Sequence, residues 1–301
     1  MRIPKTLKWI FDFYLFGNFH IALCAVAITL TTQSFFYLSL RKELLVFVFC
    51  GTFFGYNLQR LPAAFEKNSI QRQFRRHHWN TQHRLLLTLV SAIAAIAFIW
   101  SFSRLYFRSQ LVALVPAFLS FAYAFPVIPA RGKWRKLREI SGIKIFIIAV
   151  TWAISCVLLP LAAVHHTGAT WFSAASLLWA LACALLIFAL TVPFDVRDLH
   201  YDAEKLKALP SLLGVKKSIY IAIAALIISA VIPWINWHYL DTGNERQALA
   251  YSVWVVIASV FVYRSSPERQ EYYFSFVIDG LILLLGLMVC NSRLLFGFIQ
   301  L

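Results

Sequence analysis

Long apolar runs separated by shorter polar or basic segments repeat along the whole chain, and they predict a series of membrane-spanning helices. Each run approaches the twenty or so residues that a helix needs to cross the hydrocarbon layer. We do not expect strands, because open sheet edges cannot face lipid. The predicted spans lie near residues 13–36, 44–61, 85–101, 110–129, 143–164, 171–192, 218–235, 248–263 and 272–292.

The composition supports this interpretation of the pattern. The 301 residues are 60% hydrophobic and only 14% charged, with a mean hydropathy of +0.71, whereas a soluble domain carries about 25% charged residues. We therefore predict an all-α, polytopic membrane protein whose helices form one domain over residues 1–301. The basic start is followed by a long apolar run without a small-residue cleavage site, so we expect a retained first span and no signal peptide.

The formal net charge of +15 follows the alternation of the predicted loops. Most of the 28 Lys and Arg residues fall at the amino terminus and in every second loop, around 60–84, 131–144, 197–217 and 264–269. By the positive-inside rule these segments are cytoplasmic. We thus expect an inner-membrane protein with a cytoplasmic amino terminus and no nucleic-acid partner.

Three carboxylates follow the sixth predicted span. Asp195, Asp198 and Asp202 are spaced i, i+3 and i+7, which places them on one face of a helix at the cytoplasmic end of the span. Carboxylate oxygens are the ligands that Mg²⁺ prefers. The alternative is a solvated helix end whose carboxylates pair with Arg197 or Lys205.

The residues after this cluster add a family resemblance. Residues 195–214 read Asp-x-x-Asp-x-x-x-Asp and then Ala-Leu-Pro-x-x-Leu-Gly, and this segment resembles the second aspartate-rich motif of the UbiA-type intramembrane prenyltransferase family. The nine spans, the side of the motif and Tyr123-Ala-Phe-Pro126 before a basic run agree with that family. The resemblance implies a UbiA-like helical bundle.

The resemblance also implies a reaction and a site. Family members transfer an isoprenyl group from an allylic diphosphate to a lipophilic acceptor, with Mg²⁺ holding the diphosphate and aromatic rings sheltering the allylic cation. Carried onto this chain, the metal ligands are Asp195, Asp198 and Asp202, with Asp198 and Asp202 also assigned as catalytic. The residues expected at the diphosphate are Asn57, Arg60, Lys133 and Lys207.

The first aspartate-rich motif of the family is altered here. Asn57 is present, but Leu58, Leu61 and Phe65 stand where the family has aspartates, and Glu66 comes one place late. One metal could suffice if a basic side chain supplies the missing charge. Alternatively, the protein binds a lipid phosphate or a membrane partner without turnover, or the first motif lies elsewhere in the chain.

A third class of function is transport. Asp279 lies inside the last predicted span, where a carboxylate should face the interior of the bundle. Proton coupling through Asp279 would suit a transporter, whereas a helix–helix hydrogen bond beside Gly280 is the structural alternative. The five cysteines are scattered singly and are expected to be small buried hydrophobes.

Overall fold

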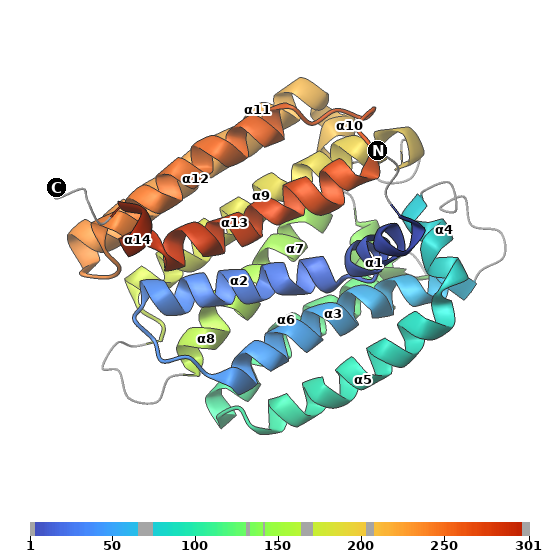
Figure 1. The fold of residues 1–301 in the computed structure, drawn as a ribbon, viewed down its shortest axis with the longest axis horizontal. Coiled ribbons are helices and arrows are strands. Elements are labelled where there is room, and N and C mark those ends of the chain that lie inside the picture. Colours follow the sequence, from blue (N-terminus) through green and yellow to red (C-terminus); the bar gives the residue numbers. More distant parts are fainter. Residues whose placement is uncertain are drawn as a thin grey trace. The chain divides into compact units, whose positions relative to one another are not determined.

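The computed structural model describes residues 4–65, 75–130, 133–140, 142–163, 171–202 and 208–296. The side chains of residues 60–65, 75, 77, 130, 133 and 200–202 are outside this description. The described chain is mostly helical (Figure 1). It divides into two units. Unit 1 comprises Met1–Val26 and Arg41–Leu105, and unit 2 comprises Ala27–Leu40 and Tyr106–Leu301. The prediction of one domain over 1–301 stays a prediction.

Unit 1 is built on a pair of long helices that pack along one another. Its elements are α1 (Lys5–Phe16), the start of α2 (Phe19–Phe35), α3 (Lys42–Phe65), α4 (Arg75–Gln82) and α5 (Arg84–Ser103). The α3 helix packs against α5, and the rings of Phe19 and Phe53 meet at 4.6 Å between centroids. Between α1 and α2 the chain bends by 54°, and Asn18 in the bend has a φ of +71°.

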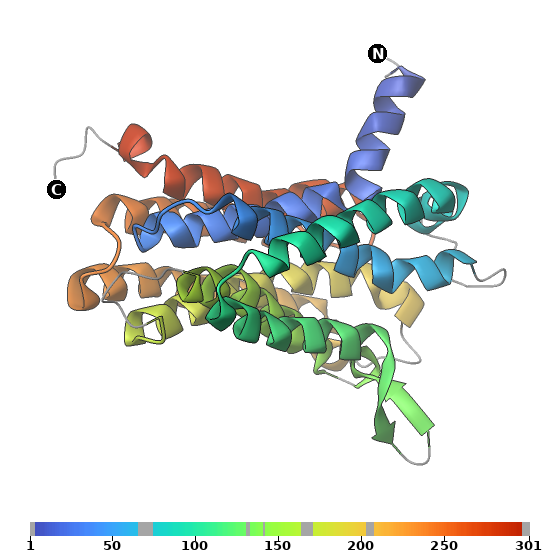
Figure 2. The same cartoon turned by 90° about the horizontal axis from the view of Figure 1, so that it is seen from below.

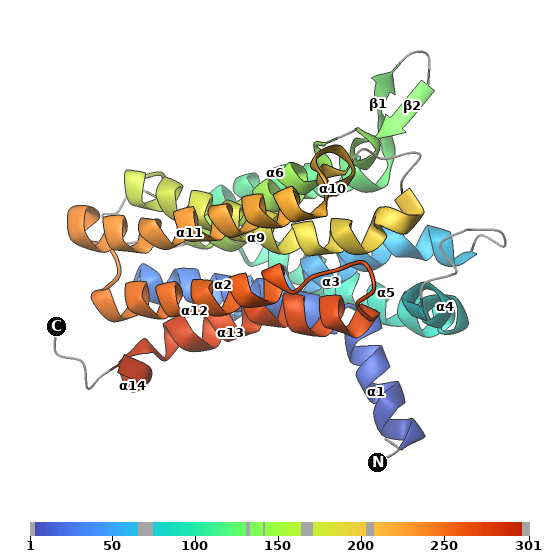
Figure 3. The ribbon, with the colours of Figure 1, turned by 90° about the horizontal axis from the view of Figure 1, so that it is seen from above.

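Unit 2 holds the remaining helices, with α9 at its centre. Its elements are the second half of α2, α6 (Phe107–Ala124), β1 (Pro126–Ala130), β2 (Lys133–Lys136), η2 (Leu137–Glu139), α7 (Lys144–Ala153), η3 (Ile154–Leu158), α8 (Leu159–Ala162), α9 (Ala174–Asp202), α10 (Leu209–Leu213), α11 (Val215–Leu240), α12 (Glu245–Tyr263), η4 (Tyr273–Ile278), α13 (Asp279–Cys290) and α14 (Ser292–Phe296). Helix α9 packs against α7 and α11, α11 packs against α12, and α12 against α13 (Figure 3). Two segments, η3 and η4, are π-helical turns that continue into α8 and α13.

The helices match the apolar runs. Seven are long and apolar enough to cross a membrane, and the bent pair α1 and α2 makes up to eight. These counts refer to the described residues only. Each of the nine predicted spans contains a long helical segment, but α3, which is long enough, is not among the helices that pass the apolar criterion. Its second half carries Asn57, Gln59 and Arg60. The prediction of an all-α polytopic bundle is confirmed, and the chain is an integral membrane protein.

The expectation that the chain has no strands is wrong. Strands β1 and β2 form an antiparallel hairpin beyond the end of α6 (Figure 2), with Pro129 opposite Trp134 and Ile128 opposite Arg135. The lipid argument applies to backbone inside the hydrocarbon layer. The predicted span 110–129 is too long at its carboxyl end, because α6 ends at Ala124 and the apolar residues Pro126–Ala130 form β1, ahead of the basic strand β2.

Candidate functional site in unit 2

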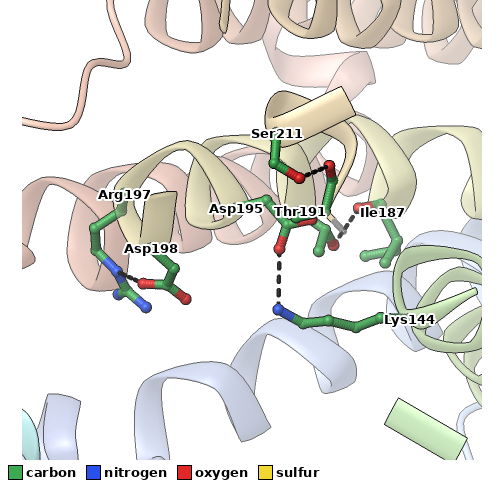
Figure 4. A network of polar contacts seen from close by, with 8 residues as sticks. Lys144, Ile187, Thr191, Asp195, Arg197, Asp198 and Ser211 are labelled. Atoms are coloured by element: carbon green, nitrogen blue, oxygen red, sulfur yellow. Dashed lines mark hydrogen bonds and ion pairs between the residues drawn. The ribbon is translucent and has the colours of Figure 1, made fainter. Parts of the chain in front are cut away.

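The aspartate cluster lies at the carboxyl end of the central helix of unit 2. Helix α9 runs continuously for 29 residues through Pro193, and its last two turns carry Asp195 and Asp198. The missing N–H of Pro193 leaves one backbone bond unmade, and the hydroxyl of Thr191 nearby donates to the carbonyl of Ile187 at 2.7 Å. The helix therefore holds both aspartates on a regular backbone (Figure 4).

Asp195 is paired with a lysine from another helix. The ammonium of Lys144, the first residue of α7, lies 2.9 Å from Oδ1 of Asp195. The Asp195 side chain is only 2% exposed, whereas that of Lys144 is 26% exposed. A carboxylate this deeply buried is ionised only with a compensating charge beside it, and Lys144 provides that charge.

Asp198 is paired with its neighbour Arg197. Nε of Arg197 lies 2.7 Å from Oδ1 of Asp198, and Nη1 lies 3.8 Å from a carboxylate oxygen of Glu271, just before η4. The guanidinium also lies over two aromatic rings, 5.2 Å from the centroid of Phe194 and 5.6 Å from that of Phe274. Arg197 thus links the end of α9 to the segment that leads into the last span.

Asp279 belongs to the same group of charges. It is within electrostatic range of Arg197, and Asp198 is within range of Lys144. Four carboxylates, of Asp195, Asp198, Glu271 and Asp279, and two cations, of Lys144 and Arg197, thus belong to one group of interacting charges. Burial makes it costly to leave any charge of this group without an opposite charge beside it.

The structure describes the other predicted site residues to different extents. Asp202 ends α9, Arg60 lies in α3 and Lys133 begins β2, but their side chains are outside the description. Lys207 and Glu66 lie outside the described residues altogether. Among the described residues no group of three or more His, Cys, Asp or Glu side chains is arranged to hold a metal. The predicted metal trio of Asp195, Asp198 and Asp202 stays a prediction.

Asn57 lies in unit 1, within a buried polar chain. It is 1% exposed, accepts a hydrogen bond from Nδ2 of Asn18 at 2.8 Å and donates to the carbonyls of Gly17 and Phe53. Asn18 in turn accepts a 2.6 Å hydrogen bond from Arg76. In the structure, Asn57 holds the bend between α1 and α2.

Sequence reasoning missed Lys144, Arg197 and Glu271 as members of the site. The charge pattern explains Lys144 as one of the basic residues that set topology, and Arg197 as a partner in a solvated helix end. Glu271 carries one usable signal, because it is an acidic residue beside the start of the last span. Its partner Arg197 is not evident from the sequence.

Comparison with known proteins supports a fold assignment. No family model matches the chain, and no curated protein matches it. The structure is similar to that of a UbiA homolog from Archaeoglobus fulgidus bound to GPP and Mg²⁺, with 9% identity, a TM-score of 0.60, and coverage of 93% of this chain and 99% of that one. The same homolog bound to DMAPP and Mg²⁺ gives 11% identity and a TM-score of 0.61 over 93% and 99% of the two chains.

A third solved structure, that of a digeranylgeranylglyceryl phosphate synthase, has a TM-score of 0.59 at 14% identity over 96% of this chain and 98% of that one. The similarity therefore spans nearly the full length of all the chains. The protein has the fold of the UbiA-type intramembrane prenyltransferases.

Proposed function

We propose that the protein transfers a prenyl group, within the membrane, from an allylic isoprenyl diphosphate to a lipophilic acceptor. The observation that carries the proposal is the group of four carboxylates and two cations at the end of α9. Transfer breaks the bond between the allylic carbon and the diphosphate oxygen and joins that carbon to the acceptor, which gives up a proton. A diphosphate leaves with its negative charge, and the site must stabilise it.

Two carboxylates among the described residues fit a magnesium ion in their chemistry. Mg²⁺ is commonly bound by one or two carboxylates together with substrate phosphates. Asp195 and Asp198 supply two such groups at the end of α9. When bound, Mg²⁺ supplies positive charge against the departing diphosphate.

The chain's own residues would orient the metal ligands. Arg197 fixes Asp198 by its 2.7 Å contact and is itself held by Glu271 and the two phenylalanine rings. The rings of Phe194 and Phe274 stabilise the Arg197 guanidinium that lies over them. Arg60, Lys133 and Lys207 remain proposed ligands of the diphosphate, Asp202 a proposed metal ligand, and Asn57 a proposed support.

The test is binding of geranylgeranyl diphosphate to the purified protein in detergent, with and without Mg²⁺, for the wild type and Asp198→Asn. We expect Mg²⁺-dependent binding that the variant weakens about tenfold or more, because one charged ligand is lost. Arg197 keeps Glu271 and Asp279 as partners, so the variant should fold. Asp241→Asn, the same change in the turn after α11, is the matched control. Absence of binding by the wild type under every condition contradicts the proposal.

A second candidate is a relative that binds a lipid phosphate without turnover. The burial of Asn57, and the leucines and phenylalanine in place of the first aspartate motif, favour it. Binding of the diphosphate that depends neither on Mg²⁺ nor on Asp198 would support this candidate.

Transport is the third candidate function. Asp279 lies in the same charge group as Arg197, so its position gives transport no separate site.

A further inference from the structure

We propose that Lys144 is a resident counter-ion that exchanges partners during binding: it holds Asp195 in the resting state and moves to the diphosphate when a divalent cation takes its place. The inference rests on the proposed function, since it assigns a role to a residue of the same site. Neither the aspartate motif nor the family resemblance singles out Lys144.

Lys144 limits the access of a cation to Asp195. The Asp195 side chain is 2% exposed, and the ammonium of Lys144 lies 2.9 Å from its Oδ1 (Figure 4). The Lys144 side chain is 26% exposed. An incoming cation that approaches from solvent meets Lys144 first. Asp195 can therefore serve as a ligand only after the ammonium has moved.

Lys144 can also move away from Asp195. Its ammonium lies at the end of a flexible four-carbon stem, so it can leave Asp195 by rotamer changes without moving α7. Arg197 is less mobile than Lys144. Its planar guanidinium is held on several sides by two aromatic rings, Asp198 and Glu271. Of the two described cations of the group, Lys144 is the one that is free to exchange.

The position of Lys144 in its helix favours an anion beside it. Lys144 is the first residue of the ten-residue helix α7, where the helix dipole already places partial positive charge and a cation is unfavourable. An anion next to Lys144 therefore stabilises it in either state. Asp195 provides that anion in the resting state, and a diphosphate bearing several negative charges would provide it in the bound state.

The exchange predicts opposite effects of one substitution on two ligands. Lys144→Met removes the competitor for Asp195, so the affinity for Mn²⁺ alone should rise about tenfold or more, the size of effect that a neighbouring charge has on a carboxylate. The same variant loses a contact to the diphosphate, so the affinity for geranylgeranyl diphosphate in Mg²⁺ should fall about tenfold. A purely structural lysine predicts no gain in Mn²⁺ affinity.

Asp195→Asn is the complementary test: it removes the buried carboxylate and leaves the charge of Lys144, whose side chain is 26% exposed. It releases Lys144, so the affinity for geranylgeranyl diphosphate without any metal should rise about tenfold. The double variant Lys144→Met/Asp195→Asn is the matched control, because it removes both charges and should show neither gain. Lys144→Arg should keep both wild-type affinities within a few-fold.

The experiment is titration of purified full-length protein in detergent, with Mn²⁺ followed by electron paramagnetic resonance and the diphosphate by calorimetry. Opposite shifts in Lys144→Met and a metal-free gain in Asp195→Asn support the exchange. Unchanged or weaker Mn²⁺ binding in Lys144→Met, or no gain in Asp195→Asn, overturns it while wild-type binding stands. If the wild type binds neither Mn²⁺ nor the diphosphate, the proposed function itself fails. Should Lys144→Met not fold, the Asp195→Asn titration decides.

Discussion

At the scale of single residues, Thr32 connects three elements of unit 2. Its hydroxyl accepts from the indole N–H of Trp179 on α9 at 3.1 Å and donates to the carbonyl of Cys156 in η3 at 2.9 Å. Phe35, one turn further along α2, stacks on Trp179 with ring centroids 4.0 Å apart. Because no water reaches such groups, one buried hydroxyl satisfies two partners that would otherwise be unpaired.

We expect Thr32→Val to lower the free energy of unfolding by about 1–2 kcal/mol, since it leaves the Trp179 N–H and the Cys156 carbonyl unpaired. The measurement is unfolding of the purified protein by SDS in mixed micelles. Thr31→Val is the control, because the buried hydroxyl of Thr31 bonds only to the carbonyl of Ala27 in its own helix. Equal losses for the two variants would show that the contact between elements contributes nothing.

At the scale of elements, close helix packing depends on small residues. A Cβ added to Gly286 of α13 would lie 2.9 Å from Cβ of Ala27 and 3.3 Å from its carbonyl oxygen, so α13 and the second half of α2 approach closely there. Trp254 of α12 reaches α13 from another side and donates to the carbonyl of Leu281 at 2.6 Å. Small residues at such contacts allow backbones to approach, which is the main source of helix association in lipid.

Gly286→Ala should therefore destabilise unit 2 by about 1–3 kcal/mol through overpacking against Ala27. Ala27→Gly in the same chain should restore part of the loss, because it removes the clashing Cβ. Gly55→Ala is the matched control: a Cβ at Gly55 meets nothing within 4 Å, and alanine favours a helix more than glycine does. Thermal unfolding in detergent measures all three. A Gly286→Ala variant as stable as Gly55→Ala would contradict the packing argument.

At the scale of the whole molecule, the basic loops and the carboxylate group lie at one end of the helices of unit 2. The end of α9, α10 and the start of α11 lie together, and Arg197 contacts Glu271 beside the loop after α12. The turn between α11 and α12 lies at the opposite end of α12, which has 19 residues and spans roughly 28 Å. By the positive-inside rule, we expect the proposed diphosphate site to face the cytoplasm.

This orientation predicts the side from which two new cysteines are labelled. In a background with the native cysteines replaced by alanine, Gln270→Cys should react with a membrane-impermeant maleimide only from the cytoplasmic side, because it lies in the loop after α12, next to Glu271. Thr242→Cys, in the turn before α12, should react only from the other side. The measurement uses right-side-out and inside-out vesicles, and the reverse pattern would place the carboxylates outside.

The positions of the helices were predictable from the sequence because lipid is a demanding solvent. Every backbone polar group must bond within its own segment, so each long apolar run becomes a helix, and all nine predicted spans contain one. The spacing of Asp195 and Asp198 on one helix follows from the same local rule. The hairpin of β1 and β2 escaped prediction because the apolar residues of β1 continue the run of α6, so that hydropathy alone extends the span to residue 129.

The partners of the charged residues were decided only by tertiary structure. Lys144 and Asp195 are 51 residues apart and meet because α7 packs against α9. Arg197 meets Glu271 because the segment around η4 returns to the end of α9. Asn57 accepts a hydrogen bond from Asn18, which lies in the bend after α1. The sequence by itself determined which segments enter the membrane and that carboxylates end one of them, because those properties depend on neighbouring residues. Packing between distant helices determined which cation each carboxylate holds.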